Sequence, residues 1–257
     1  MNIPINSWTS IYKDIKPSKH NIDALHNDGY MIVRNHFDKS LINQIYKKFS
    51  NDVESGKIGS PSGNPVRTKN VLVDYPESES VVFDQKIIDI CNQYYGHIPF
   101  LSNINIKRNY FSRPQITETL KFHEDPEAGK LIKVFIYLND VDIEHGPFTY
   151  VRESHKIKIP YNKSKIRWGD QEIEKFYGKE NICHLTGEAG DVILADTSGF
   201  HKGLFLKQDE RTMMTLYFLN DQLRITPAQA AEALMPLSMY EGLSPNIKPV
   251  GYFTTKL

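Results

Sequence analysis

The spacing of hydrophobic residues changes along the chain, from a helical period in the first third to short runs afterwards. In the first third, apolar residues often recur three or four positions apart, which places them on one face of a helix. Gly29 stands where the first helix should end, and Asp38 stands where the second should be capped. We therefore expect helices over 18–28, from 39 onward and over 81–95, with a strand over 30–34.

From position 99 the hydrophobic runs are short and rich in β-branched and aromatic residues, and turn residues separate most of them. Runs of this kind are typical of strands. Many short strands in succession indicate a β-sandwich or barrel. The predicted strands cover residues 100–107, 120–125, 133–138, 148–151, 182–186, 191–195 and 211–219.

The chain shows no internal repeat, low-complexity tract or linker, so we expect a single domain over 1–257. Its parts are a helical N-terminal flank over about 1–98, a β core over about 99–220 and a C-terminal extension over about 221–257. Within the extension, a proline followed by an alanine-rich run predicts a short helix over 227–234.

Composition argues against two kinds of partner. The chain has 31 basic and 31 acidic residues, so no net charge draws it to nucleic acid or to an anionic membrane. The longest apolar run, near 134–138, is far too short to span a bilayer. Cys91 and Cys183 lack the spacing of a disulfide framework, and residues 1–10 do not resemble a signal peptide. We therefore expect a cytoplasmic protein that binds neither nucleic acid nor a membrane.

Three His-x-Asp pairs suggest a search for a metal site, because two histidines and one carboxylate are the usual ligands of non-haem iron(II). One such pair is weak evidence, so its context must decide. His26 and Asp28 fall in a predicted helix, where residues two apart point in nearly opposite directions. His36 precedes a predicted helix start, where Asp38 serves as the cap.

The third pair, His123 and Asp125, ends a predicted strand that Pro126 terminates. Residues two apart in a strand share a face, so both side chains can reach one ion, while Glu124 points away. Taken alone, this pattern fits equally well a histidine that is hydrogen-bonded at a strand end.

Two later residues favour the metal site. His201 stands between two glycines just after the predicted strand over 191–195, where it can meet a site on another strand. Arg211 opens the last predicted strand, and a buried arginine needs a carboxylate partner. A dicarboxylic cosubstrate would supply one through a bidentate contact.

Taken in order, several motifs resemble the phytanoyl-CoA dioxygenase family of Fe(II)- and 2-oxoglutarate-dependent oxygenases. The resemblance covers about 100–220, and more loosely 28–49. Its pieces are Phe122-His123-Glu124-Asp125, the run over 133–142, Gly146-Pro147-Phe148, Ser154-His155-Lys156, the run over 196–203, and Glu210-Arg211. The sequence departs from the family at His145, where asparagine is common, and at Arg152-Glu153, where Pro-Gly is usual.

The resemblance implies a mainly β fold with flanking helices, the double-stranded β-helix or jelly roll. It implies iron ligands at His123, Asp125 and His201, and 2-oxoglutarate bound by Arg211. The implied activity is hydroxylation of a C–H bond of a small-molecule substrate with Fe(II), 2-oxoglutarate and O2, giving succinate and CO2 as coproducts. Related halogenases lack the carboxylate ligand, so Asp125 favours hydroxylation or a related oxidation.

Other interpretations remain open at this point. A zinc-dependent hydrolase with the same ligands, or a non-catalytic metal-binding jelly roll, would have no need of Arg211. Tyr137 is expected either to bind the cosubstrate or to pack in the core. Cationic residues are candidates for binding an anionic substrate, with a solvated surface as the alternative, and the 56–69 segment is a candidate lid or a plain connector. These cationic residues are Lys107, Arg108, Arg113 and Lys121.

Overall fold

The structure is a computed structural model, and it describes most of the chain. The described residues are 18–59, 64–68, 70–97, 99–113, 120–125, 131–160, 165–220, 235–242 and 254–255. The predicted helix over 227–234 lies outside these residues, as do positions 60–63 and 69 of the candidate lid. Within the described part, no helix is long and apolar enough to cross a membrane.

The first helix ends where the sequence predicts but begins five residues later than the expected position 18, and the second helix begins where it is predicted. Helix α2 (Asp23–Asp28) ends at Gly29, which has a left-handed backbone with φ of 87°. Helix α3 (Lys39–Glu54) begins after Asp38, whose side chain accepts a hydrogen bond from the backbone N–H of Ser40. The cap satisfies a backbone donor that the first helical turn leaves unpaired.

The helix predicted over 81–95 is wrong as a single element, because it is two helices. Helix α5 (Glu79–Val82) ends before Asp84, whose side chain accepts from the N–H of Ile87 and starts helix α6 (Gln85–Tyr95). The apolar stripe continues across this break, so the hydrophobic pattern of the sequence does not reveal it. Further short helices are α4 (Val71–Asp74), α7 (Asp170–Tyr177) and α9 (Leu237–Gly242), with 3-10 turns at Pro76–Ser78 and Lys179–Asn181.

Two antiparallel sheets form the β part of the molecule, one large and one small. The large sheet has the strand order β1-β7-β4-β9-β3-β2, and the small one has the order β6-β5-β8. Bounds in the large sheet are β1 (Tyr30–Val33), β2 (Val66–Thr68), β3 (Phe100–Tyr110), β4 (Leu131–Tyr137), β7 (Val192–Asp196) and β9 (Glu210–Leu219). Those in the small sheet are β5 (Phe148–Val151), β6 (Ile182–Leu185) and β8 (His201–Gly203). A separate parallel pair joins β10 (Met235–Pro236) to β11 (Thr254–Thr255).

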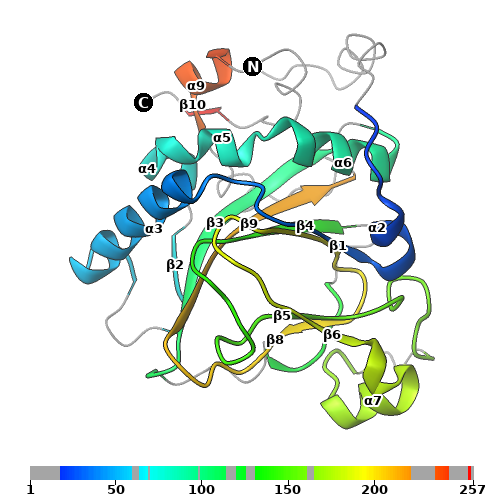
Figure 1. Cartoon of the computed structure of the whole chain (residues 1–257). Helices are drawn as coiled ribbons and strands as arrows, with labels where there is room; N and C mark the ends of the chain where they lie inside the picture. The colour runs from blue at the N-terminus through cyan, green and yellow to red at the C-terminus, as the bar shows by residue number, and fades with distance from the viewer. Residues whose placement is uncertain are drawn as a thin grey trace.

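Between β4 and β9 the chain passes back and forth between the two sheets. Strand β4 lies in the large sheet, β5 and β6 in the small one, β7 in the large, β8 in the small and β9 in the large. Figure 1 shows the small sheet below the large sheet, with helices α3 to α6 on the other side. The expected jelly roll with flanking helices is confirmed.

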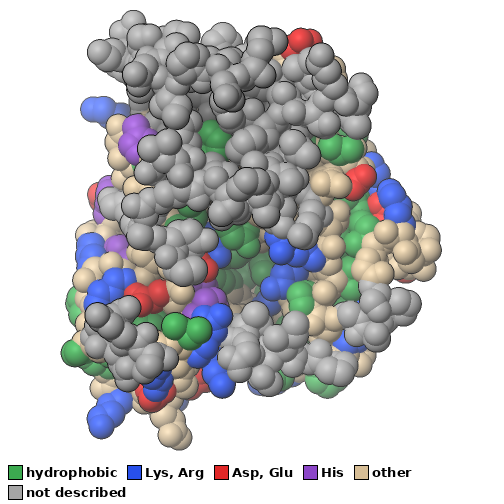
Figure 2. All heavy atoms as spheres, turned by 180° about the vertical axis from the view of Figure 1, so that it is seen from behind, with side chains coloured by type: hydrophobic (Ala, Val, Ile, Leu, Met, Phe, Trp, Pro, Cys, Tyr) green, Lys and Arg blue, Asp and Glu red, His purple; other side chains and the backbone are tan. Residues whose placement is uncertain are grey.

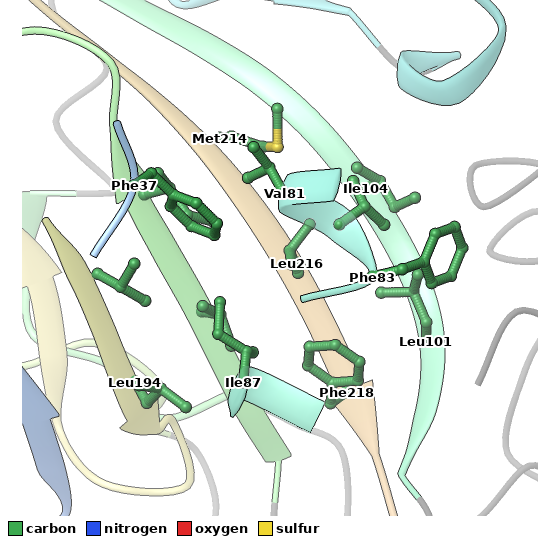
Figure 3. Close-up of a cluster of buried hydrophobic side chains, with 14 of the residues drawn as sticks. Phe37, Val81, Phe83, Ile87, Leu101, Ile104, Leu194, Met214, Leu216 and Phe218 are labelled. Atoms are coloured by element: carbon green, nitrogen blue, oxygen red, sulfur yellow. The ribbon is translucent and has the colours of Figure 1, made fainter. Parts of the chain in front are cut away.

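Strand alternation divides the hydrophobic residues between the two faces of the large sheet. On strand β4, Val134 and Ile136 belong to the core against the helices, whereas Phe135 and Tyr137 belong to the core between the sheets. Figure 3 shows side chains of the helix-side core. It packs Val81 and Ile87 from the helical segment near Leu194 and Leu216 from the sheet. This packed layer fixes the large sheet, so its other face can carry a site.

Candidate metal and anion site

The segment carrying His123 and Asp125 is not the strand that the sequence predicts. It makes only isolated bridges, from Phe122 to Trp168 and from His123 to His201. His123 and His201 exchange backbone N–H to carbonyl hydrogen bonds of 3.0 and 2.9 Å, and the N–H of Asp125 donates to Thr197. These bonds hold the segment beside β8, so His123 and His201 lie opposite each other without a regular strand.

His123, Asp125 and His201 form a cluster that can hold a metal ion, and it is the one cluster of this kind within the described residues. One potential ligand atom from each lies within 4.8 Å of the other two. The two imidazole ring centres are 4.4 Å apart, and His201 Nε2 is 3.6 Å from Asp125 Oδ2. Two histidines and one carboxylate with open positions are diagnostic of non-haem iron(II) oxygenases.

Hydrogen bonds orient both imidazoles toward this shared point. His123 Nδ1 lies 3.0 Å from the carbonyl oxygen of Lys121, and His201 Nδ1 lies 2.9 Å from that of Gly199. With Nδ1–H donating to a carbonyl, each ring presents its Nε2 lone pair to a metal. The donor set therefore fits a metal held through two Nε2 atoms and one carboxylate.

Protonation states in the site also suit metal binding. Burial lowers the pKa of His201 to about 3, although Asp125 opposes this shift. Burial likewise lowers the pKa of His123. Burial disfavours ionised Asp125, but the positive charge of Lys133 outweighs it and holds the pKa of Asp125 well below the usual range. The site thus has neutral imidazoles and an ionised carboxylate, the forms that bind metals.

The competing acidic residues and His-x-Asp pairs are engaged elsewhere. Glu124 forms an ion pair with Lys158 and points away from the cluster, as expected. His36 contacts Asp84 at 2.9 Å. His26 stacks on Tyr94, with ring centres 4.9 Å apart. Neither early His-x-Asp pair is part of a metal cluster among the described residues.

A cavity of about 200 Å³ adjoins the cluster between the two sheets. Figure 2 shows a hollow with hydrophobic side chains inside it and basic and histidine side chains around it. The large sheet supplies one wall, through residues that share a face of β3, β4 and β9. The cavity-lining residues used below are Lys107, Asn109, His123, Lys133, His201, Lys202, Arg211 and Tyr217.

Arg211 lines this cavity as a buried cation whose hydrogen bonds are incomplete. Its side chain donates from Nη2 to Asn109 Oδ1 at 3.3 Å, whereas Nε and Nη1 are buried and have no hydrogen-bond partner in the described structure. Burial lowers the pKa of the guanidinium. Unpaired buried donors on a cation are costly, so this geometry fits an anion that enters the cavity and accepts from them.

Lys107 lines the same cavity on the neighbouring strand. Burial and the nearby charge of Arg211 lower its pKa to about 7. A carboxylate bound between Lys107 and Arg211 would reverse this shift, because an opposite charge favours the ammonium form.

The structure places the remaining predicted residues differently. The prediction for Arg108 is wrong: it lies on the helix side of β3, where its Nε is 3.0 Å from Glu210 Oε1 and its guanidinium covers Phe49. Lys121 is exposed, and Arg113 stacks on Tyr110 at 3.9 Å. Neither is among the residues that line the cavity. Of the four candidate cations, Lys107 alone faces the site.

Tyr137 is buried, and its hydroxyl is already engaged within the protein. It donates to the carbonyl oxygen of Leu185 at 2.7 Å and accepts from the N–H of Phe148 at 3.2 Å. These bonds tie the large sheet to the small one. A contact between Tyr137 and a cosubstrate stays a prediction.

At one position where the sequence departs from the family motif, the backbone still has the conformation that the usual residue would adopt. Glu153 stands where glycine is usual and adopts φ of 63°, the left-handed conformation that glycine favours. Its N–H donates to the carbonyl oxygen of Asp28 at 3.0 Å. The turn therefore keeps a glycine-like shape despite the bulkier residue.

The sequence interpretation missed Lys133, which lines the cavity and lies 2.6 Å from Asp125 Oδ2 through its Nζ. Because the rest of strand β4 is hydrophobic, the sequence suggests that its single lysine points to solvent. The available signal was alternation, because Lys133 shares a face with Phe135 and Tyr137.

Comparison with known proteins yields one family. The family model described as phytanoyl-CoA dioxygenase matches residues 25–204. No curated protein sequence matches significantly.

Several solved structures share the fold at low sequence identity. HygX from Streptomyces hygroscopicus, solved with nickel and 2-oxoglutarate, has a TM-score of 0.62 and 14% identity over 78% of this chain and 86% of its own. SnoK, an alpha-ketoglutarate-dependent carbocyclase of nogalamycin biosynthesis, has a TM-score of 0.59 and 16% identity, covering 78% and 83%. EctD from S. alaskensis, solved with bound Fe, has a TM-score of 0.56 and 18% identity, covering 80% and 78%.

Proposed function

The chain belongs to the phytanoyl-CoA dioxygenase family, and on that basis we propose that it is an Fe(II)- and 2-oxoglutarate-dependent dioxygenase that hydroxylates a C–H bond of a small molecule. The observation that carries the proposal is the position of Arg211. An incompletely bonded buried arginine lines the same cavity as His123 and His201. A metal site and a carboxylate-binding cation in one cavity suit a cosubstrate that contacts both.

In this proposal His123, Asp125 and His201 hold the iron. Iron held by these three side chains would keep open positions for the cosubstrate and dioxygen. When bound, iron with 2-oxoglutarate and O2 supplies the oxidising power, placing one oxygen atom in the product and one in succinate, with release of CO2. The protein's part is to orient these groups and to keep wasteful reactions out.

Arg211 and Lys107 are proposed to bind the distal carboxylate of 2-oxoglutarate. The free Nε and Nη1 donors of Arg211 offer a bidentate contact, and Asn109 steadies the guanidinium through Nη2. Lys107 adds a second positive charge on the same face of the sheet. No acidic side chain is among the described residues that line the cavity. The cosubstrate carboxylate would therefore be the negatively charged partner of both cations.

Arg211 also separates this function from the two alternatives. A zinc hydrolase that used the same ligands would need no buried carboxylate anchor in the cavity. A non-catalytic module would have no reason to keep a buried cation with unpaired donors, because such a group destabilises the fold. Structural relatives include a protein named as a carbocyclase. Hydroxylation is our proposal because Asp125 occupies the ligand position that halogenases leave to chloride.

Addition of 2-oxoglutarate to the anaerobic Fe(II)-loaded protein is expected to produce a weak visible charge-transfer band. The band arises when the keto acid chelates the iron, so the Zn(II)-loaded protein serves as the matched control and should show none. Absorbance titration measures the band, and calorimetry on the same sample measures 2-oxoglutarate binding. Iron-loaded protein that shows no band would contradict the proposal.

A further inference from the structure

We propose that helix α7 and the residues just before it position the two histidine ligands, so that metal binding and the ordering of α7 are coupled. This inference rests on the metal site of the proposed function and adds the part of the chain that holds its geometry. Trp168 and Ile173 are then positioning residues, because they act through the neighbours of the ligands and are not members of the metal cluster.

The three ligands are held from two sides. Asp125 is held from the large sheet, because Lys133 Nζ is 2.6 Å from its Oδ2 and 4.5 Å from the centre of the Tyr217 ring. The imidazoles come from the other side, one from β8 and one from the 120–125 segment beside it. Because that segment makes only isolated bridges, a small number of contacts determines where His123 lies.

Backbone hydrogen bonds on both edges hold the residues at His123. On one edge, His123 exchanges N–H to carbonyl hydrogen bonds of 3.0 and 2.9 Å with His201. On the other edge, Phe122 exchanges bonds of 3.0 and 2.8 Å with Trp168, which lies two residues before α7 begins. Trp168 is therefore the outer neighbour of this segment, and its position depends on the chain that leads into α7.

The residues that precede both histidine ligands pack in a core that α7 completes. Phe122 immediately precedes His123 and is completely buried. Phe200 immediately precedes His201 and is 2% exposed. Ile173 comes from α7, which Figure 1 shows on the side of the small sheet away from the large sheet, and loss of its side chain would loosen the packing next to both ligands. This α7 core consists of Phe122, Val151, Ile173 and Phe200.

An ion pair makes a further connection between α7 and the ligands. Lys202 immediately follows His201, and its side chain is 6% exposed. Its Nζ is 2.6 Å from Oδ1 of Asp170, the first residue of α7, and 4.6 Å from the centre of the Phe122 ring. Displacement of α7 would leave this buried ammonium without Asp170, which is costly. The pair therefore favours the arrangement in which α7 is ordered against the metal site.

Coupling between two parts of a protein is reciprocal. If an ordered α7 holds the imidazoles for the metal, a metal bound to both imidazoles stabilises the ordered α7 by the same factor. A core that only stabilises the fold behaves differently. Its disturbance would lower the melting temperature and leave the metal affinity of the folded protein unchanged.

Ile173→Ala is expected to raise the Kd for Ni(II) about tenfold, as found for residues that orient metal ligands. Ni(II) alone, titrated calorimetrically into the full chain, measures the affinity. Ile45→Ala is the matched control, because Ile45 is completely buried in α3, on the other side of the large sheet, and loses the same atoms. It should also lower the melting temperature but change the Kd by less than about twofold, as expected of a distant site.

Hydrogen exchange of the wild type tests the same coupling without any substitution. Saturating Ni(II) is expected to slow the exchange of the α7 amides about tenfold, and by more than the amides of α3. No slowing in α7, or equal slowing in both helices, would overturn the inference. So would an unchanged Kd in a folded Ile173→Ala protein, or an equal loss of affinity in Ile45→Ala.

The wild-type titration separates this inference from the function on which it depends. A wild type that binds no Ni(II), or binds it equally well after Asp125→Ala, would contradict the metal site itself and the inference with it. Normal Ni(II) binding that depends on Asp125 but not on Ile173 would contradict the role of α7 alone.

Discussion

Replacing Arg211 by alanine is expected to raise the 2-oxoglutarate concentration for half-maximal turnover by about a hundredfold, the usual cost of removing one partner of a buried charged contact. The loss should be specific to the cosubstrate, because Arg211 is not one of the three clustered metal ligands. Metal affinity, measured by anaerobic Fe(II) titration, should therefore change little. Succinate formation at varied 2-oxoglutarate measures the effect.

Arg211→Lys is the matched control for this prediction. It keeps the positive charge but loses the planar fork, so its requirement for 2-oxoglutarate should fall between those of the wild type and the alanine variant. Thermal unfolding of both variants shows whether they fold. A folded Arg211→Ala protein with wild-type dependence on 2-oxoglutarate would remove Arg211 from its proposed role.

Replacing Asp125 by alanine is expected to abolish turnover and to weaken Fe(II) binding severely. The change removes the only anionic ligand of the proposed triad. It also leaves the ammonium of Lys133, now 2.6 Å from Asp125 Oδ2, as a repulsive charge beside the metal site. Anaerobic Fe(II) titration and succinate formation measure the two losses.

The adjacent carboxylate provides a close control. Glu124 pairs with Lys158 and is 38% exposed, so Glu124→Ala should change metal affinity by less than about twofold. If Asp125→Ala kept full activity while Glu124→Ala lost it, the metal ligand would be Glu124 and the assigned geometry would be wrong.

Much of the fold follows from local patterns that act within a few residues. Asp38 caps α3 because its carboxylate reaches the N–H of Ser40 two positions on. Strand β5 forms over Phe148–Val151, as its β-branched and aromatic residues predict. The break between α5 and α6 was not predicted, because Asp84 acts as a cap inside an apolar stripe that would also suit one continuous helix.

The site depends on contacts between distant segments, which sequence patterns describe less well. Strand β8 is only His201–Gly203 and pairs with β5, some fifty positions earlier, so nothing local predicts it. Alternation shows that Lys107 and Arg108 face opposite ways, but it does not show which one meets the cavity. The packing of α3 against β3 decides this, since Arg108 covers the Phe49 ring. The His-x-Asp pair was identifiable because its chemistry lies within three residues.

Diffraction at the iron absorption edge, from crystals grown anaerobically with Fe(II) and 2-oxoglutarate, locates the metal without reference to activity. We expect one anomalous peak at coordination distance, roughly 2 Å, from His123 Nε2, His201 Nε2 and a carboxylate oxygen of Asp125. The distal carboxylate of 2-oxoglutarate should lie against Arg211. A peak that these three side chains do not share, in protein that binds iron stoichiometrically, would contradict the assignment of the metal centre and of the chemistry built on it.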